Sequence, residues 1–180
     1  MKKYEFTGET KIINLCGKEV TLHRIKAVIE FGLIKAGELG GWIEKESNLS
    51  HNSKSWVCGN AEVWGNAKVC GDAKVCGNAK VCGNAKVCGD AKVWDNAEVS
   101  QVDHILVIGP AGSRNDFTTF YRDKDNEITV KCGCFLGKID KFLKKVTQTH
   151  KGNKYAIVYR ASAELAKLQI DLSEESEENE

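Results

Sequence analysis

The chain has 180 residues, of which 42% are hydrophobic and 28% charged, and its 26 basic residues nearly balance its 25 acidic ones. No apolar stretch reaches the roughly 18 residues that a membrane-spanning helix needs, and the first residues lack the apolar segment of a secretion signal. These features exclude a membrane-spanning helix and predict a cytoplasmic protein of one compact domain or two small ones.

Residues 1–42 are predicted to form a β-rich cap. Short runs of β-forming residues occur at 4–6, 11–15, 19–25 and 27–31, and the glycines at 8, 17 and 32 interrupt this part of the chain. Trp42 and, further on, Trp56 are predicted to be packing residues. We expect this part to close the first coil of the repeat region that follows.

Residues 43–103 carry a six-residue repeat. From Val57 to Val99 the units read VCGNAE, VWGNAK, VCGDAK, VCGNAK, VCGNAK, VCGDAK and VWDNAE. This period is typical of a hexapeptide solenoid, in which three units form one coil. The valines and alanines are predicted to point inward, and each glycine followed by Asn or Asp is predicted to turn a corner. Asp95 replaces the last of these glycines, so we expect a strained or altered corner there.

The repeat has an earlier, imperfect start. Ile43 and Leu49 are one unit apart, whereas the step from Leu49 to Val57 is two residues longer than a unit. The spacing predicts an irregular coil at the beginning and a two-residue insertion after Leu49.

Substitutions within the repeat also recur at every third unit, which supports a three-sided coil. Asp72 and Asp90 are three units apart, and Glu62, Lys80 and Glu98 form one column of alternating charge. Such a column predicts ion pairs between successive coils. Two further columns are purely basic: Lys68 with Lys86, and Lys74 with Lys92.

The outward position after each valine holds an unusual set of residues: Cys58, Trp64, Cys70, Cys76, Cys82, Cys88 and Trp94. Together they predict an apolar outer surface that needs covering. We expect a homo-oligomer, with a trimer favoured, and packing by the flanking segments is the alternative. Because five cysteines share one position of the repeat, free thiols are predicted rather than a disulfide framework. A soft metal ion on stacked thiolates is a further alternative, but no metal or cofactor is predicted.

Residues 104–170 are predicted to form a small α+β module, and the acidic residues 171–180 a disordered tail. The predicted strands are 105–108 (a buried one), 116–122 and 127–132, with turns at 109–112 and 123–126. Two helices follow from the helical spacing of these apolar residues: Ile139, Phe142, Leu143 and Val146 for the first, and Ala161, Leu165 and Leu168 for the second.

The glycine-rich segment 109–116 is the strongest candidate for a ligand site. After a strand, its backbone N–H groups could bind an anion or phosphate together with Ser113 and Arg114. The full set of predicted ligand residues is Ser113, Arg114, Asn115, Asp116, Tyr121, His150 and Lys154. The alternative is a connecting turn in which Arg114 pairs with Asp116. Cys132 and Cys134 are interpreted as structural thiols, with a redox or metal pair as the alternative.

The repeats resemble the left-handed parallel β-helix family. With LHRIKA and LGGWIE before the repeats, and IGPAGSRNDFTTFY and CGCF after them, the chain is similar to hexapeptide-repeat proteins of bacterial phages and prophages. The resemblance implies a mainly β fold: a short left-handed parallel β-helix with the β-rich cap and the α+β module at its ends. It also implies that the protein acts in a bacterial host cell.

Three functions follow as hypotheses. The first is a non-catalytic binding protein that interferes with a bacterial defence or regulatory system, by binding a host protein or by sequestering an anionic nucleotide. The second, implied by the left-handed β-helix resemblance, is an acyl-CoA-dependent acyltransferase, for which His51 and His104 are the candidate catalytic residues; no histidine interrupts the repeats, which counts against it. The third is a structural or assembly protein. Neither a membrane partner nor sequence-specific DNA binding is predicted.

Overall fold

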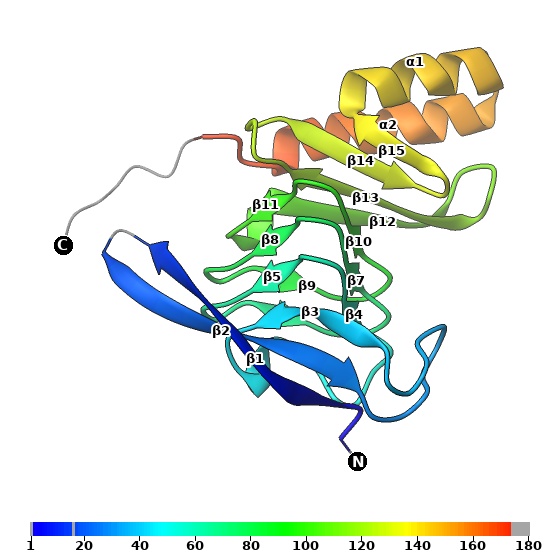
Figure 1. Ribbon diagram of the computed structural model, residues 1–180. Coiled ribbons are helices and arrows are strands. Elements are labelled where there is room, and N and C mark those ends of the chain that lie inside the picture. Colours follow the sequence, from blue (N-terminus) through cyan, green and yellow to red (C-terminus); the bar gives the residue numbers. More distant parts are fainter. Residues whose placement is uncertain (1, 16, 174–180) are drawn as a thin grey trace. The chain divides into compact units, whose positions relative to one another are not determined.

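The computed structural model describes residues 2–15 and 17–173 (Figure 1). The chain is mainly β-structure and divides into two compact units between Val102 and Asp103. The first unit contains a β-rich N-terminal part and a β-solenoid, and the second contains a sheet and two helices. No helix in the described part of the chain is long and apolar enough to cross a membrane.

The N-terminal part is built on a long antiparallel hairpin of β1 (Tyr4–Leu15) and β2 (Lys18–Ala27). The two predicted runs at 4–6 and 11–15 are one strand, interrupted by a bulge between Phe6 and Thr10. The strand predicted at 27–31 is wrong. Phe31 and Ile34 exchange backbone hydrogen bonds of 3.1 and 2.9 Å around Gly32, whose φ is +57°, so the chain turns there.

The solenoid begins with β3 (Leu39–Ile43), which pairs with β2 on one side and runs parallel to β5 on the other. The short 3-10 helix Glu46–Asn48 follows. Ile43 pairs with Val63 and Leu49 with Val69, whereas Val57 pairs with Val75. The residues of the first two pairs are two positions further apart in the sequence than those of the third pair. The predicted two-residue insertion after Leu49 is therefore confirmed.

Eight two-residue strands continue the solenoid: β4 (Trp56–Val57), β5 (Glu62–Val63), β6 (Lys68–Val69), β7 (Lys74–Val75), β8 (Lys80–Val81), β9 (Lys86–Val87), β10 (Lys92–Val93) and β11 (Glu98–Val99). They form three parallel ladders, with the orders β3-β5-β8-β11, β4-β7-β10 and β6-β9. Every third strand is thus a neighbour, which confirms the predicted register of three units per coil.

The interior of the solenoid is filled by stacked valines and alanines. All eight valines and all seven alanines of the repeat are at most 1% exposed. Because each strand contributes only one inward valine and each corner one inward alanine, burial of these small side chains is the main stabilising contribution of a coil.

Polar ladders on the outside follow the same register. The amide of Asn60 donates to Asn78 at 3.3 Å, and Lys80 pairs with Glu98 at 3.2 Å. The predicted alternation is incomplete, because Glu62 pairs with Lys11 of the hairpin at 2.6 Å. The Lys80–Glu98 pair is half exposed, so its contribution to stability is small.

The corners need a left-handed backbone. The repeat glycines that precede Asn or Asp have φ values between +54° and +76°, and Asp95 has φ of +64°. The predicted altered corner at Asp95 is confirmed, since a non-glycine residue there takes the conformation that glycine adopts freely.

The prediction of free thiols in the repeat is wrong for four cysteines. Cys58 and Cys76 form one disulfide, and Cys70 and Cys88 form another. In both pairs the Cα atoms are 4.7 Å apart, because residues three units apart lie on neighbouring strands, and this spacing falls within the range that disulfides span. Cys82 lies between Trp64 and Ser100 in its column, so no cysteine lies one coil away from it.

The outward side chains after each valine are less exposed than expected for an uncovered apolar surface. Trp64 is only 8% exposed, and the cysteines and Trp94 are half-buried. The expected oligomer interface on these positions stays a prediction.

Trp56 is the packing centre of the N-terminal part. Its side chain is fully buried, with the rings of Tyr4 and Phe31 at 6.4 and 5.3 Å. Lys3 is buried beside them and donates from Nζ to the carbonyl oxygens of Ser53 and Ser55 at 2.8 and 2.6 Å. Burial lowers the pKa of Lys3 to about 8.

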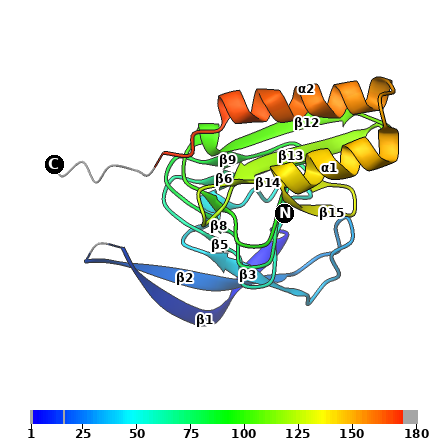
Figure 2. The same ribbon diagram turned by 90° about the horizontal axis from the view of Figure 1, so that it is seen from above.

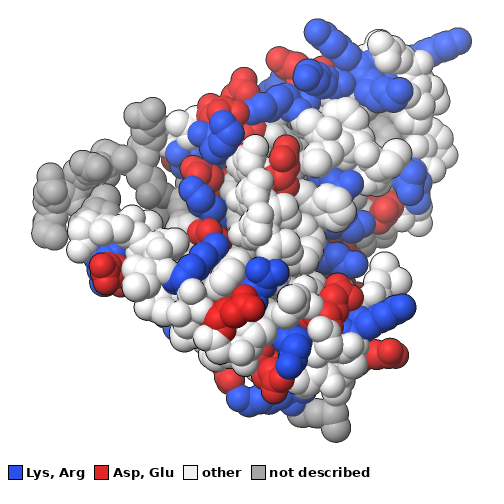
Figure 3. Space-filling view, in the orientation of Figure 1, with Lys and Arg blue, Asp and Glu red and all other residues white. Residues whose placement is uncertain are grey.

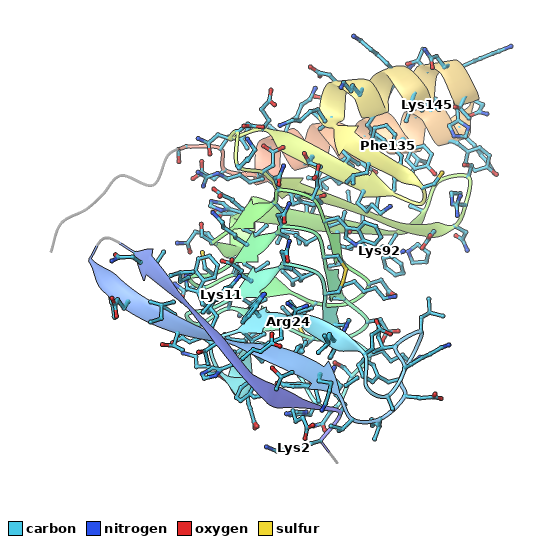
Figure 4. The ribbon with its side chains drawn as sticks, in the orientation of Figure 1. Lys2, Lys11, Arg24, Lys92, Phe135 and Lys145 are labelled. Carbon is cyan, nitrogen blue, oxygen red and sulfur yellow. A yellow bond between two sulfur atoms is a disulfide. The ribbon has the colours of Figure 1, made fainter. Side chains whose placement is uncertain are left out.

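Trp42 is half-buried and has a different environment. Lys11 Nζ and Arg24 Cζ lie 4.6 and 5.2 Å from the centre of its ring, and both basic side chains come from the hairpin (Figure 4). The tryptophan therefore fixes the hairpin on β3 through cation–π contacts as well as backbone pairing.

The short 3-10 helix Val102–His104 begins at the last residue of the first unit. It leads into the antiparallel sheet of the second unit, which has the order β12-β13-β14-β15. Its elements are β12 (Ile105–Ala111), β13 (Asp116–Arg122), β14 (Ile128–Cys132), β15 (Phe135–Lys138), α1 (Ile139–His150) and α2 (Lys154–Gln169). Both helices cover one face of the sheet (Figure 2). The core between them is apolar and contains Phe120, Val130, Phe142, Tyr159 and Ala163.

Three details differ from the predictions for this unit. β12 continues to Ala111, so the turn lies at 112–115 instead of 109–112. β12 is half-buried rather than buried, because it is an edge strand. β15 was not predicted, since its Phe-Leu-Gly-Lys sequence has no clear alternation.

The predicted disorder of 171–180 falls mainly on residues 174–180, which lie outside the described residues. The N–H of Asp171 donates to the carbonyl oxygen of Asp103 at 3.3 Å, and that of Ser173 donates to Asp171 Oδ1 at 2.8 Å.

Candidate ligand-binding site

The second unit contains a cleft of about 200 Å³ between α1, the end of β14, the start of β15 and the turn at 112–115. It is lined by Ser113, Arg114, Cys132, Cys134, Phe135, Phe142, Lys145, Val146, Thr149, His150 and Tyr159. Figure 4 labels Phe135 and Lys145, which come from β15 and α1.

The turn is fixed against α2 through Tyr159. The N–H of Ser113 donates to Tyr159 Oη at 3.2 Å. Gly112 has φ of +72°, and a Cβ atom at this position would overlap the Tyr159 ring. Both the positive φ and the close approach of the Tyr159 ring therefore require a glycine at position 112. The hydrogen bond from Ser113 to Tyr159 holds the turn at the cleft.

Ser113, His150 and Tyr159 form the polar group of the cleft. Ser113 Oγ lies 3.4 Å from His150 Nε2 and 3.5 Å from Tyr159 Oη, and the two rings are 5.5 Å apart. No carboxylate is among the described residues that line the cleft, so His150 lacks the orienting acid of a serine-hydrolase triad. The group is suited to hydrogen bonding with a ligand.

Arg114 and Lys145 give the cleft its positive charge. Both side chains are exposed, and Lys and Arg side chains gather over α1 (Figure 3). Arg114 lies over Gly133, since a Cβ atom on Gly133 would be 2.9 Å from Arg114 Cζ. The alternative pairing of Arg114 with Asp116 does not occur among the described residues; Asp116 Oδ1 instead accepts the N–H of Phe117 at 2.8 Å.

Aromatic side chains form the apolar wall of the cleft. The rings of Phe135 and Phe142 are 5.4 Å apart, and Phe142 meets Tyr159 edge to face at 5.7 Å. Val146, one turn further along α1, is buried beside them. The cleft therefore combines cationic groups at its mouth with an aromatic wall.

Of the predicted ligand residues, the fold brings together Ser113, Arg114 and His150. The others do not line the cleft: Asn115, Asp116, Tyr121 and Lys154. Tyr121 is fully buried in the sheet, and Lys154 Nζ lies 5.1 Å from the centre of the Tyr155 ring.

Sequence reasoning did not identify Lys145, Thr149 and Tyr159 as site residues. Lys145 and Thr149 are four residues apart and so lie on one face of α1, next to Val146 and His150, which are also four residues apart. This helical spacing could have identified Lys145 and Thr149 as site residues from the sequence. Tyr159 has the spacing of a core residue, and it does belong to the core. Only the packing of α2 also brings its hydroxyl group to the turn.

Cys132 and Cys134 lie at the edge of the cleft, and neither forms a disulfide. Cys132 Sγ accepts a hydrogen bond from Thr118 Oγ1 at 3.2 Å, whereas Cys134 is exposed. Cys132 is thus engaged within the sheet, and Cys134 is the accessible thiol of the pair.

The two candidate catalytic histidines lie in different units and both have partners. His51 stacks on Tyr4 at 4.1 Å and accepts the N–H of Lys3 at Nδ1, and burial lowers its pKa. His104 is buried, with Nε2 at 3.2 Å from Arg122 Nη1. Neither lines the cleft.

A cluster of three carboxylates lies in the turn after β13, at Asp123, Asp125 and Glu127. Lys138 Nζ is 2.7, 3.3 and 2.6 Å from them. Partial burial lowers the pKa of Lys138, but the hydrogen bonds that its ammonium group donates to Asp123 and Glu127 outweigh this effect and raise the pKa above its usual value. The ammonium group occupies the centre of the cluster, which ties the turn to β15.

Comparison with known proteins adds no relative. The chain matches no model of a protein family, and no curated protein is significantly similar to it.

Proposed function

We propose that this chain is a non-catalytic binding protein whose C-terminal cleft takes a small anionic ligand. The proposal rests on the kinds of residue that line the cleft. Arg114 and Lys145 lie at its mouth, no acid lines it among the described residues, and Phe135 and Phe142 form its wall. Guanidinium and ammonium groups recognise phosphate and carboxylate, and aromatic walls accept flat groups.

The volume of the cleft limits the size of the ligand. At about 200 Å³ it is smaller than the roughly 300–1,000 Å³ of ordinary small-molecule pockets. We therefore expect the cleft to take a phosphorylated sugar or one end of a nucleotide rather than a whole dinucleotide. Ser113 and His150 would supply hydrogen bonds to it.

The biological role that we propose rests on the resemblance to phage and prophage hexapeptide-repeat proteins. In this role the solenoid is a left-handed β-helix that assembles a homo-oligomer in the bacterial cytoplasm, with a trimer on the outward cysteine and tryptophan positions favoured. The C-terminal unit sequesters an anionic nucleotide or binds a host protein, and so interferes with a defence or regulatory system.

The experiment is isothermal titration of the full chain with three probes, namely inorganic phosphate, AMP and acetyl-CoA. We expect AMP or phosphate to bind, and Arg114→Gln to weaken this binding about 10- to 100-fold, the effect of losing one charged hydrogen bond of about 1.5–3 kcal/mol. Lys145→Gln should also weaken the binding of AMP or phosphate. Lys144→Gln is the matched control, because Lys144 is exposed on the same helix but does not line the cleft.

Two results would contradict the proposal. One is the absence of binding for all three probes, and the other is an equal loss of affinity in Arg114→Gln and Lys144→Gln. Binding of acetyl-CoA that disappears in His104→Ala would instead favour the acyltransferase.

A further inference from the structure

The helix α2 is apolar on two opposite faces. Toward the sheet it buries Ala156, Tyr159, Ala163 and Ala166 in the core of the C-terminal unit. On the opposite face it exposes Ile157, Leu165 and Leu168, which are 63%, 49% and 86% accessible. A surface helix normally carries polar residues on its outer face, and a helix that is apolar all round is normally buried.

These exposed residues form one continuous stripe. Ile157, Ala161, Leu165 and Leu168 are separated by four, four and three residues, so they lie on the same side of the helix. The neighbouring helix α1 shows the usual pattern, with Phe142 and Val146 buried and three lysines on its other positions. The two helices lie side by side (Figure 2), but only α2 has an apolar outer face.

We infer that the outer stripe of α2 packs antiparallel against α2 of a second copy of this chain. The charges at the ends of the stripe favour this partner. Placing Ile157 of one copy opposite Leu168 of the other sets the register. Antiparallel packing also brings Lys154, at the N-terminal end of α2, close to the C-terminal end of the partner helix, which Asp171 follows two residues after Gln169.

The two-fold arrangement therefore pairs a basic end with an acidic end twice. Lys154 and Asp171 are both exposed and so available to a partner. Antiparallel helices also bring opposite ends of their dipoles together. Near the centre of the stripe the small side chain of Ala161 allows the helix axes to approach to the usual distance of about 8–10 Å. A two-fold interface of this kind uses the same patch on both copies, as most dimers do.

The inference is independent of the ligand in the cleft and of the outward cysteines and tryptophans of the solenoid. Those positions belong to the first unit, whereas the stripe belongs to the second. The mass of the assembly and its response to changes on α2 therefore test this surface separately.

The experiment is sedimentation velocity of the full chain over a range of protein concentrations. We expect the mass to halve in Leu168→Glu, because the glutamate places a charge in the apolar contact. Leu33→Glu is the matched control, since Leu33 is 83% exposed and lies in the first unit. We expect it to leave the mass unchanged. Helical circular dichroism should be unchanged in Leu168→Glu, because an exposed position tolerates substitution.

Charge exchange tests the register. Lys154→Glu and Asp171→Lys should each weaken the dimer about 2- to 10-fold, the range expected for exposed ion pairs, and the double variant should recover the affinity of the wild type. A wild-type chain of 19.8 kDa at all concentrations would overturn the inference. An assembly whose mass does not respond to Leu168→Glu would overturn it as well.

Discussion

Two glycines of the solenoid provide a sharp test of how its corners stack. Gly71 and Gly89 are three repeat units apart and have φ values of +66° and +67°. A Cβ atom on Gly71 would lie 2.7 Å from the backbone N and 2.9 Å from the backbone O of Gly89, whereas a Cβ atom on Gly89 would have no neighbour within 4 Å. The two sites therefore share one backbone conformation and differ in what lies next to them.

Substitution by alanine separates the two effects. The left-handed conformation of an alanine costs about 1–2 kcal/mol at either site. At Gly71, displacement of the adjacent corner adds the cost of overpacking, about 1–3 kcal/mol. We therefore expect Gly89→Ala to lower the free energy of unfolding by about 1–2 kcal/mol and Gly71→Ala by about 2–5 kcal/mol.

Urea unfolding followed by tryptophan fluorescence measures this difference in the correct unit, because all four tryptophans lie before residue 103. The dependence on urea should have the same slope in both variants if the exposed surface is unchanged. Equal losses in the two variants, or a larger loss in Gly89→Ala, would refute the stacking of each corner on the corner three units later.

Three further predictions concern single residues. Asp95→Gly should raise the stability of the first unit by about 1 kcal/mol in the same assay, since it relieves the positive φ of Asp95; a lower stability would contradict this account. Asn153→Ala should lower the stability of the second unit by about 1 kcal/mol, because the Asn153 side chain caps α2; ellipticity at 222 nm, which both helices dominate, measures it, and an unchanged midpoint would argue against the cap. Burial lowers the pKa of Lys3 from 10.5 to about 8, so the unfolded chain binds more protons than the folded one between these pH values. The stability of the first unit should therefore rise with pH from about 8 to 10.5. Lys3→Met should abolish this rise, and an equal rise in the variant would exclude Lys3 as its cause.

The sequence alone determined the solenoid because a coil uses interactions that repeat at a fixed distance along the chain. Inward Val and Ala, corner glycines and the register of three units per coil could all be inferred from spacing. Even the irregular coil at Ile43 and Leu49 was predictable, since the insertion changes the spacing by two residues. In the flanks, turns around Gly32 and after Ala111 depend on backbone hydrogen bonds that composition does not reveal.

The candidate site could be predicted only in part. Ser113 and Arg114 were identifiable because they follow a strand in a glycine-rich turn, and His150 because it ends a basic helix. Tyr159 could not be identified, because its hydrogen bond to Ser113 joins residues 46 positions apart. Tyr121 was assigned to the site because its ring could stack on a nucleotide, but it is fully buried in the sheet.

Only the tertiary structure showed that stacked cysteines are joined by disulfides. The three-unit register places Cys58 next to Cys76 and Cys70 next to Cys88. Free thiols were predicted there, but stacking brings these Cα atoms to 4.7 Å and both pairs are disulfides. Likewise, Leu168 has the periodicity of a core residue but lies outside, since α2 buries its alanine face against the sheet. Local patterns set the conformation of each element, and the period of the repeat also sets which solenoid strands pair. Contacts outside the repeat depend on distances in space that the order of residues does not contain.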